Sequence, residues 1–382
     1  MRDVRRQGAR AARVVLALAV LGSACRPGKD ASSASAVSLD DPAARRTITE
    51  RLGGPLVDHH VHILGPDVIR DWRAVGVNFS RPDSTYTSVA AWMASRGLDS
   101  THVQALVLVP MAQLYGDAEF VEALKIDATA VQARVAREND HVAREAAQHP
   151  TRAVALCAAP VLADFAEAEL VRCLAHPQTT GIKLHLAASG VDLREPAHVT
   201  RTAALIAFAA AQNVPVLLHL DTQQRGTETT DVRAFLDRAL GPVASLPVII
   251  AHAGGSGGYG AWTRSVLRTI LAWRDSVDAL GPAPRPVYID LSAVLLDEPS
   301  EGVPASTTEE RAALRVDVRA AGLDRFAFGS DSPVFHPLQS AETLRAALAL
   351  SSKEARELFS RPVPAFFSSV DARGTGRAIT RD

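Results

Sequence analysis

Apolar runs and amphipathic stretches alternate along this chain from Pro55 onward. Eight short runs, such as VQALVLVP and PVLLHL, are continuous enough to be buried parallel strands. They are expected at 56–64, 102–109, 152–158, 180–186, 214–220, 246–252, 286–291 and 325–330. Amphipathic helices fit between them, for example at 120–148, 163–175, 199–212, 230–240, 261–279 and 307–321. This alternation predicts an α/β fold, the (β/α)8 TIM barrel.

A doubly wound open sheet is the structural competitor of the barrel. The GxGxxG turn that would favour it does not follow the first expected strand. Segment 65–100 is long for a single connection, so we expect an inserted lid after strand 1, over the barrel mouth. The barrel domain should occupy residues 51–368, followed by a disordered tail at 369–382.

The first 25 residues are expected to be a targeting signal rather than part of the fold. A basic stretch with five arginines precedes the apolar run 14–21, which is too short to span a bilayer. Gly22 to Cys25 follow, and the whole resembles a bacterial lipoprotein signal peptide with lipidation at Cys25; plain secretory cleavage is the alternative. Residues 26–50 are rich in Ser, Ala and Asp and should form a flexible tether. We therefore expect an exported protein, periplasmic or membrane-anchored as a lipoprotein.

The amino-acid composition limits the kinds of molecule that this protein is expected to bind. The 382 residues are 47% hydrophobic, which allows a sizeable core. Their formal net charge of -1 lacks the excess of positive charge that is typical of nucleic-acid-binding domains. We expect a small-molecule substrate and membrane contact only through the anchor; the sequence leaves the oligomeric state open. The three cysteines have no CxxC spacing, which argues against a thiolate zinc site. Cys157 and Cys173 could form a disulfide or remain buried thiols.

The first candidate functional residues lie in the stretch VDHHVHI at 57–63. On a strand, Asp58, His60 and His62 share one face, because side chains alternate. Two imidazoles one residue apart can converge on a single metal ion. His59 should face the helices and be structural. A surface strand with clustered histidines is the alternative interpretation.

Further histidines fall at the ends of the expected strands. His185, His219 and His252 end the fourth, fifth and sixth strands, and Asp331 follows the eighth. In a barrel these ends meet at one face, where catalytic groups collect. A metal site at that face is therefore expected.

Five motifs together resemble the amidohydrolase superfamily, specifically its amidohydrolase-2 branch of metal-dependent hydrolases and non-oxidative decarboxylases. The motifs are VDHHVH, GIKLH, VPVLLH, VIIAHAGG and FAFGSDSP, within about residues 54–360. The resemblance implies metal ligands at His60, His62, His219 and Asp331, a set that suits Zn²⁺, as one or two ions, with an open position for water. It also implies that His252 either ligates a second ion or contacts substrate and assists proton transfer.

Lys183 and His185 share a face of the fourth strand. In binuclear relatives a lysine on this strand is carbamylated and bridges two ions, so Lys183 is a ligand if it is carbamylated; a structural ion pair is the alternative. His185 either lines the substrate site or orients a ligand, and Asp58 is expected to make a supporting hydrogen bond. The glycine-rich AHAGGSGGYG after the sixth strand could hold an anion or simply be a mobile loop.

The favoured function is hydrolysis of a C–N or C–O bond (amide, ester or lactone) by a metal-activated water. Asp331 would act as general base and His252 would stabilise charge or shuttle a proton. A non-oxidative decarboxylase, a lyase with the same metal site, is the alternative. A non-catalytic metal- or ligand-binding lipoprotein is the third interpretation.

Overall fold

The computed structural model describes residues 39–300 and 302–368 of the chain. Its centre is a sheet of eight parallel strands paired in chain order. The strands are β1 (Leu56–His62), β2 (Val103–Val109), β3 (Ala153–Ala158), β4 (Thr179–His185), β5 (Val216–His219), β6 (Val248–Ile250), β7 (Val287–Asp290) and β8 (Phe326–Ala327). The chain after β8 returns to β1, where His62 N donates to Ser332 O over 2.7 Å and Asp331 N donates to His60 O over 2.9 Å. The expected (β/α)8 barrel is therefore confirmed.

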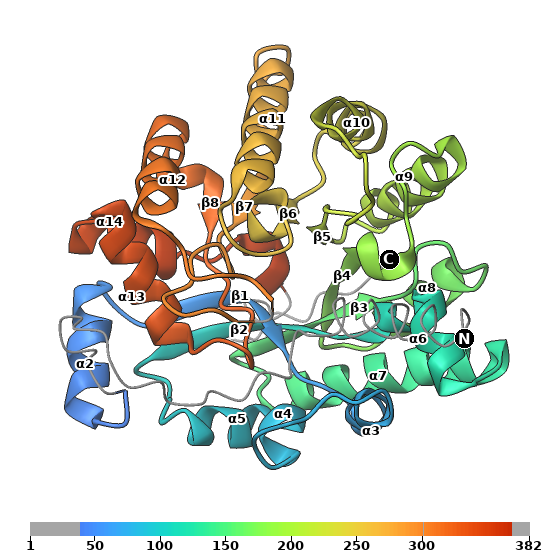
Figure 1. Ribbon diagram of the computed structural model, residues 1–382, viewed down its shortest axis with the longest axis horizontal. Coiled ribbons are helices and arrows are strands. Elements are labelled where there is room, and N and C mark those ends of the chain that lie inside the picture. The colour runs from blue at the N-terminus through green and yellow to red at the C-terminus, as the bar shows by residue number, and fades with distance from the viewer. Residues whose placement is uncertain (1–38, 301, 369–382) are drawn as a thin grey trace, which may run out of the picture.

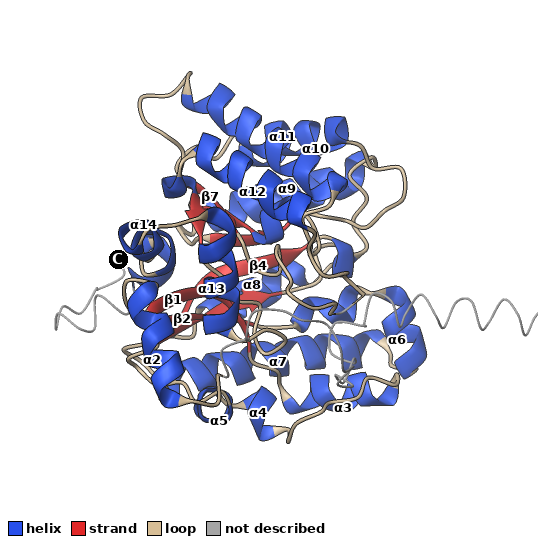
Figure 2. Ribbon diagram, turned by 60° about the vertical axis from the view of Figure 1, so that its left-hand side comes forward, coloured by secondary structure: helices blue, strands red, loops and turns tan. Residues whose placement is uncertain are grey.

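Helices surround the strands on the outside (Figures 1 and 2). The main ones are α2 (Pro42–Arg51), α3 (Pro66–Ala74), α4 (Ser84–Thr87), α5 (Val89–Ser95), α6 (Ala118–Leu124), α7 (Ala128–Gln148), α8 (Ala166–Leu174), α9 (Pro196–Ala211), α10 (Thr229–Phe235), α11 (Ala261–Asp278), α12 (Thr308–Ala321), α13 (Pro337–Leu348) and α14 (Ser352–Phe359). Short helical turns are η2 (Ala112–Gly116), η3 (Ala187–Ser189), η4 (Leu236–Leu240), η5 (Ala251–Gly254) and η6 (Leu323–Arg325). The helix expected at 120–148 is two helices, because Lys125 takes a left-handed conformation and ends α6.

Two apolar layers hold the barrel together. The outward side chains of the strands pack against the helices in one large cluster that includes Leu106, Ile182 and Leu218. The inward side chains form a smaller cluster, which Phe366 and Phe367 from the C-terminal segment complete. Burying a side chain such as Phe366 stabilises the fold by about 1.5–3 kcal/mol. The C-terminal segment thus fills the barrel at the end away from the histidines.

Segment 65–100, where we expected a lid, folds into α3, α4 and α5. Its apolar side chains pack with those of η2, α6 and α7 in a separate cluster. Within the described chain, Trp72 is the residue of this segment that lines the pocket at the carboxyl ends of the strands. Closure of this segment over the barrel mouth stays a prediction.

The folded part begins earlier than expected. α2 occupies 42–51 and so overlaps the end of the predicted tether 26–50, and Asp41 caps it by accepting from Ala43 N over 2.9 Å. Ile48 of α2 and the adjacent Leu52 are buried in the core, which explains why this stretch is helical. The signal peptide, Cys25 and the tail 369–382 lie outside the described residues. In the described part, none of the helices has the length and apolar character needed to cross a membrane.

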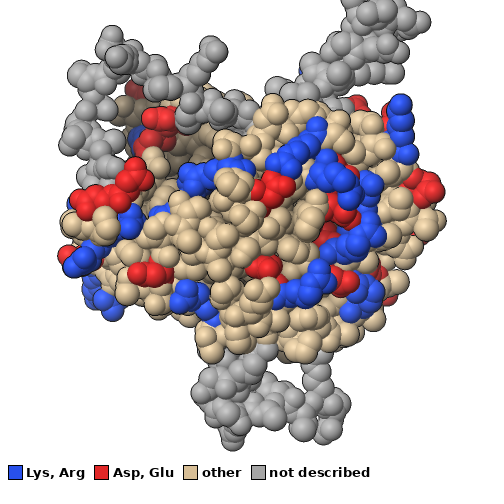
Figure 3. All heavy atoms as spheres, turned by 90° about the horizontal axis from the view of Figure 1, so that it is seen from below, with Lys and Arg blue, Asp and Glu red and all other residues tan. Residues whose placement is uncertain are grey.

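A disulfide joins Cys157 on β3 to Cys173 on α8, which settles one alternative left open by the sequence. On the surface, acidic and basic side chains are interspersed, as the face in Figure 3 shows. That mixture agrees with the net charge of -1. No broad basic stripe of the kind that binds nucleic acid is visible on that face.

Candidate metal centre and pocket

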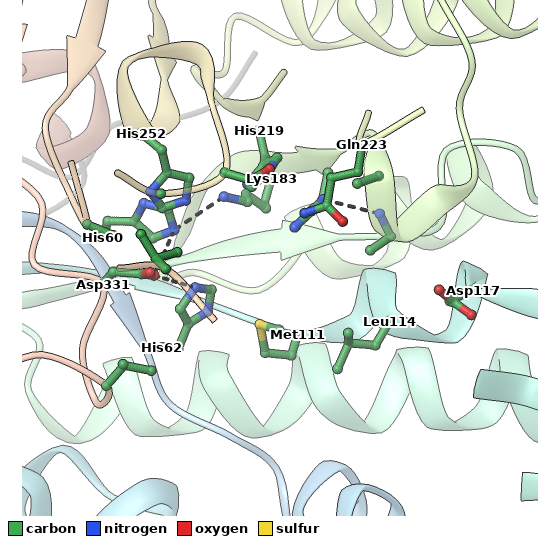
Figure 4. Close-up of a pocket in the computed structure, with 18 of the residues that line it drawn as sticks. His60, His62, Met111, Leu114, Asp117, Lys183, His219, Gln223, His252 and Asp331 are labelled. Carbon is green, nitrogen blue, oxygen red and sulfur yellow. Dashed lines mark hydrogen bonds and ion pairs between the residues drawn. The ribbon is translucent and has the colours of Figure 1, made fainter. Parts of the chain in front are cut away.

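The carboxyl ends of the strands surround a pocket of about 410 Å³. All seven side chains predicted from the sequence line it, namely His60, His62, Lys183, His185, His219, His252 and Asp331. Figure 4 labels all of them except His185 and shows these six gathered at one end of the pocket, with His60, His62 and Asp331 adjacent. The barrel therefore brings together side chains that are up to 271 residues apart in the chain.

Three of these side chains form a compact group of possible metal ligands. One ligand atom each from His60, His62 and Asp331 lies within 4.8 Å of the others. Asp331 Oδ1 is 3.3 Å from His62 Nε2 and 3.8 Å from His60 Nε2. The other ring nitrogens are engaged, because His60 Nδ1 donates to Asp290 Oδ2 over 2.7 Å and His62 Nδ1 donates to Val109 O over 3.0 Å. Both Nε2 lone pairs are consequently directed to the centre of the group, as metal ligation requires.

Asp290 and Ser292 are functional residues that the sequence interpretation missed. Asp290 is the last residue of β7 and is fully buried, and it orients His60. Gly329 allows this approach, since a Cβ there would lie 2.7 Å from His60 Cβ and 3.0 Å from Asp290 Oδ2. The available signal was the pattern YIDLS, in which Asp290 ends an apolar strand as the histidines do.

Ser292 sets the tautomer of His252. The Nδ1 of His252 donates to Ser292 O over 3.0 Å, and the Ser292 hydroxyl lies 2.9 Å from the same nitrogen. With Nδ1 as the donor, Nε2 is the nitrogen left to accept a proton or to bind an ion. Both His252 and Asp331 have positive φ angles, 54° and 59°, in a region that residues other than glycine rarely adopt. Such strain collects at functional sites, where the surrounding fold compensates for it.

Burial favours the neutral form of three of these imidazoles. Desolvation lowers the pKa of His60, His185 and His219 well below the usual value, and the charge of Lys183 acts in the same direction. For Asp331, burial opposes ionisation, but its close contact with His62 and the nearby histidines outweighs burial and holds the pKa of this carboxyl below the usual range. Neutral histidines beside an ionised carboxylate are the protonation states in which these groups bind a divalent cation.

Lys183 is 1% exposed and lies beside the compact group. Its ammonium Nζ donates to His60 Nε2 over 3.3 Å, the lone pair that an ion would use. Burial lowers the pKa of Lys183 to about 8, although the charges of Asp331 and Asp290 act against the decrease. The amine is thus easier to deprotonate than an exposed lysine, a condition for carbamate formation. Its carbamylation stays a prediction.

His219 lies in the pocket but outside the compact group of the described residues. Its ring stacks on His185 at 3.8 Å between centroids, and its Nε2 lies 3.1 Å from the Ser256 hydroxyl. Ser256, from the glycine-rich loop, donates to Asp221 Oδ2 over 2.9 Å, so His219 Nε2 is the donor to Ser256. To ligate an ion through Nε2, His219 must release this hydrogen bond.

Asp58 and His59 have supporting positions. Asp58 is fully buried and accepts from Ser330 N over 2.9 Å and from His60 N over 3.2 Å, so it links β1 to the residues after β8. His59 donates through Nδ1 to Phe328 O and accepts from Val363 N, which agrees with its predicted structural role. Its contacts are with the chain after β8 and the C-terminal segment rather than with a surrounding helix.

Away from the histidines the pocket is mostly apolar. Met111 and Leu114 lie between His62 and Asp117 in Figure 4. Asp117 and Glu119 are the acidic residues among its remaining lining, and within the described chain Lys183 is its single basic residue besides the histidines. The pocket therefore combines a nitrogen-rich inner end with an apolar wall.

A family model described as Amidohydrolase matches residues 57–361 of the chain. The search of curated proteins finds no match. One similar solved structure has been named provisionally a 2-pyrone-4,6-dicarboxylic acid hydrolase, from Pseudomonas putida (18% identity, 82% of this chain, 98% of that chain, TM-score 0.52).

Two further structures are similar. One is a 2,6-dihydroxybenzoate decarboxylase complexed with 2,6-dihydroxybenzoate (16% identity, 83% of this chain, 99% of that chain, TM-score 0.52). The other is a dihydroxybenzoic acid decarboxylase from Polaromonas sp. JS666 with bound manganese and the inhibitor 2-nitroresorcinol (16% identity, 84% of this chain, 97% of that chain, TM-score 0.51). At these identities the likeness establishes the shared fold.

Proposed function

The chain belongs to the amidohydrolase family, and from this premise we propose that it is a metal-dependent enzyme that hydrolyses a C–N or C–O bond of a small molecule. The observation that carries the proposal is the compact group of His60, His62 and Asp331 at the inner end of a pocket. Two imidazole nitrogens and an ionised carboxylate fit a divalent cation. His219, a carbamylated Lys183 and, with two ions, His252 are the proposed additional ligands.

When bound, the ion supplies Lewis-acid polarisation of a carbonyl oxygen and makes water nucleophilic at neutral pH. Asp331 accepts the proton of the attacking water, because its carboxylate is held ionised beside His62. The same carboxyl then returns that proton to the leaving nitrogen or oxygen.

His252 has a second proton-handling role. Its Nδ1 is fixed as a donor to Ser292 O, so its Nε2 can accept a proton and the resulting cation can stabilise negative charge on the substrate oxygen. His185 contributes to the substrate surface, stacked beside His219. The apolar residues Met111, Leu114 and Phe120 receive the remainder of the substrate.

Decarboxylation of a small carboxylic acid is the second candidate function. Two of the similar structures named above are decarboxylases, and one of them holds manganese. The nitrogen-rich inner end with Lys183 would attract a carboxylate. In this reaction the bond to the carboxyl carbon breaks, carbon dioxide leaves, and a proton taken from solvent is delivered through His252 or Asp331 to the remaining carbon. Zinc is our proposed metal for hydrolysis, with manganese the alternative.

We also propose that the protein is exported and anchored through a lipid on Cys25, with plain secretory cleavage as the alternative. The disulfide between Cys157 and Cys173 supports an oxidising compartment, because such bonds seldom persist in a reducing cytosol. Globomycin treatment of expressing cells tests the anchor, since a block of lipoprotein signal cleavage would increase the mass of the protein, whereas a secretory substrate would be unaffected.

The function is tested with purified protein stripped of metal and reloaded with zinc or manganese. Metal content per chain and the mass of the peptide containing Lys183 are measured, and turnover is assayed with panels of esters, lactones, amides and aromatic or enoic acids. Metal-dependent release of an alcohol or amine supports the hydrolase, and metal-dependent release of carbon dioxide supports the decarboxylase. Full metal content with no turnover in either panel would favour the non-catalytic lipoprotein.

A further inference from the structure

A second pocket, of about 650 Å³, lies at the end of the barrel opposite the metal centre. It is lined by α2 and the turn after it, by residues just before β2, and by the start of α14. Figure 1 shows α2 and α14 as neighbours at one side of the barrel. Because Gly53 and Gly54 precede β1 and His102 precedes β2, the pocket belongs to the amino ends of the strands, whereas the metal centre belongs to their carboxyl ends.

Three basic side chains line this pocket. Arg46 from α2 and Lys353 and Arg356 from α14 are exposed there, and none of the three makes an ion pair with a carboxylate in the described chain. Glu50 is the single acidic residue of the lining. Most other arginines of the fold do pair with carboxylates, for example Arg134 with Asp71 and Arg172 with Glu169. The pocket thus has two positive charges in excess and no internal partner for them.

His102 gives the pocket a fixed polar group. The residue is 8% exposed, and its Nδ1 lies 2.8 Å from Asp99 Oδ1, which orients the ring. Its Nε2 has no hydrogen-bond partner in the described part of the chain, although the ring lines the pocket. Because the ring lines the pocket, this nitrogen is accessible there to a ligand or to solvent.

Gly53 permits the close approach that forms the pocket. Its φ is 81°, and a Cβ there would lie 2.5 Å from Ser352 O and 2.8 Å from Arg356 Cβ. At Gly54 a Cβ would lie 3.8 Å from Arg356 Nη2, so the guanidinium lies over this glycine. The turn therefore positions α14 and its basic side chains against α2.

From this arrangement we propose that the pocket between α2 and α14 binds a phosphate group. Unpaired guanidinium and ammonium groups around one concave site match an oxyanion with more than one negative charge, because arginine makes paired hydrogen bonds to phosphate oxygens. The hydroxyl of Ser352, which also lines the pocket, adds a donor for the same oxygens. The phosphate is carried either by a soluble phosphate ester or by the headgroup of an anionic phospholipid.

The position of the pocket makes a headgroup a reachable source. α2 is the first helix that the structure describes and it begins at Pro42, 17 residues after Cys25. A chain of that length spans at most about 60 Å, at roughly 3.3–3.6 Å per residue. A lipid on Cys25 would therefore keep the pocket within reach of the membrane surface. Phosphate binding itself is independent of the proposed enzyme function.

The test uses the double variant Arg46→Gln/Arg356→Gln and the control variant Lys125→Gln/Arg144→Gln. Both change the net charge equally, and Lys125 and Arg144 are exposed cations without an ion pair in the described chain and away from the pocket. Binding of inorganic phosphate is measured by calorimetry at constant ionic strength. Co-sedimentation with phosphatidylglycerol vesicles is compared with that on phosphatidylcholine vesicles.

We expect phosphate to bind the wild type and the control alike, and to bind the pocket variant about tenfold more weakly or worse. Vesicle binding that requires phosphatidylglycerol and is lost in the pocket variant identifies the headgroup as the source. Phosphate binding without vesicle binding identifies a soluble phosphate ester. The proposal is overturned if neither probe binds, or if the two variants lose binding equally, since equal loss reflects net charge alone.

Discussion

At the scale of single residues, hydrogen bonds fix the tautomers of the histidines and so determine which ring nitrogen is available to a metal ion. The acceptors Asp290 Oδ2, Val109 O and Ser292 O take the Nδ1 protons of His60, His62 and His252, respectively. In each case Nε2 is left as the atom with a lone pair. Backbone and carboxylate acceptors thus determine which atom of each ring can bind an ion or accept a proton.

Replacing Asp331 by Asn should reduce turnover by about 10²–10⁴-fold, because the amide neither accepts the proton of water nor carries the ligand charge. The size of the side chain is unchanged, so the unfolding midpoint should remain close to that of the wild type. Turnover and denaturant unfolding are measured on the same samples. Asp324→Asn is the control, because Asp324 is exposed and lies in η6, directly before β8. Full activity in the Asp331 variant would remove it from the mechanism.

Replacing Asp290 by Asn should weaken metal binding by about 10–100-fold, because His60 loses the carboxylate that holds its Nδ1 proton and orients the ring. Competition of a chromophoric chelator for zinc measures the affinity. Glu298→Gln, a charge change outside the pocket, is the control. An affinity equal to that of the wild type would mean that Asp290 does not act through His60.

At the scale of elements, α7 fastens the loops at the carboxyl ends of β1 and β2. Glu138 is 1% exposed and accepts from Gly65 N over 2.7 Å and from Met111 N over 3.0 Å. Burial raises the pKa of this carboxyl to about 7, although both hydrogen bonds act against the increase. One helix side chain thus satisfies backbone groups of two loops, one of which contributes Met111 to the pocket.

Glu138→Ala should destabilise the protein by roughly 2–4 kcal/mol, because two buried N–H groups lose their acceptor. Glu138→Gln should cost less, since its amide oxygen can still accept one of them. Chemical denaturation measures both changes, and Glu122→Ala on exposed α6 should stay within about 0.5 kcal/mol of the wild type. Equal stabilities of the Glu138 and Glu122 variants would contradict this role.

At the scale of the whole molecule, buried titratable groups make stability depend on pH. Desolvation by burial lowers the pKa of six histidines, to about 4 for His59 and His336; the others are His60, His141, His185 and His219. Burial raises the pKa of Asp58 and Glu138 to about 7, which acts in the opposite sense. Below pH 6.5 the unfolded chain gains more protons on the histidines than the folded chain gains on the two carboxyls. Stability is therefore present above pH 6.5 and lost as the pH falls towards 4.

The melting temperature of the metal-free protein should therefore fall between pH 7 and pH 5. His336→Asn should make this decrease shallower, because asparagine can still accept from Leu338 N at the start of α13 but does not titrate. The measurement is calorimetry at several pH values in buffers of equal ionic strength. A flat profile for the wild type would show that the histidines are protonated without cost in the fold.

The local pattern of the sequence was sufficient to predict the barrel and the histidine, lysine and aspartate side chains that line its pocket. Eight apolar runs predicted the eight strands, and strand direction then required His60, His62, Lys183, His219 and Asp331 to meet at one face. These inferences succeed because the period of side chains along a strand and the handedness of the connection are local properties.

Contacts between distant segments were decided by the tertiary structure alone. The pairing of Cys157 with Cys173, the orientation of His60 by Asp290 and the hydrogen bond from His219 to Ser256 each depend on where two elements pack. The helix at 42–51 also depends on tertiary packing, because this weakly apolar stretch is stabilised as a helix by the burial of Ile48 and Leu52 in the core. Side chains that carry a function can be located from one strand at a time, whereas the partners that orient them become visible only when the barrel has closed.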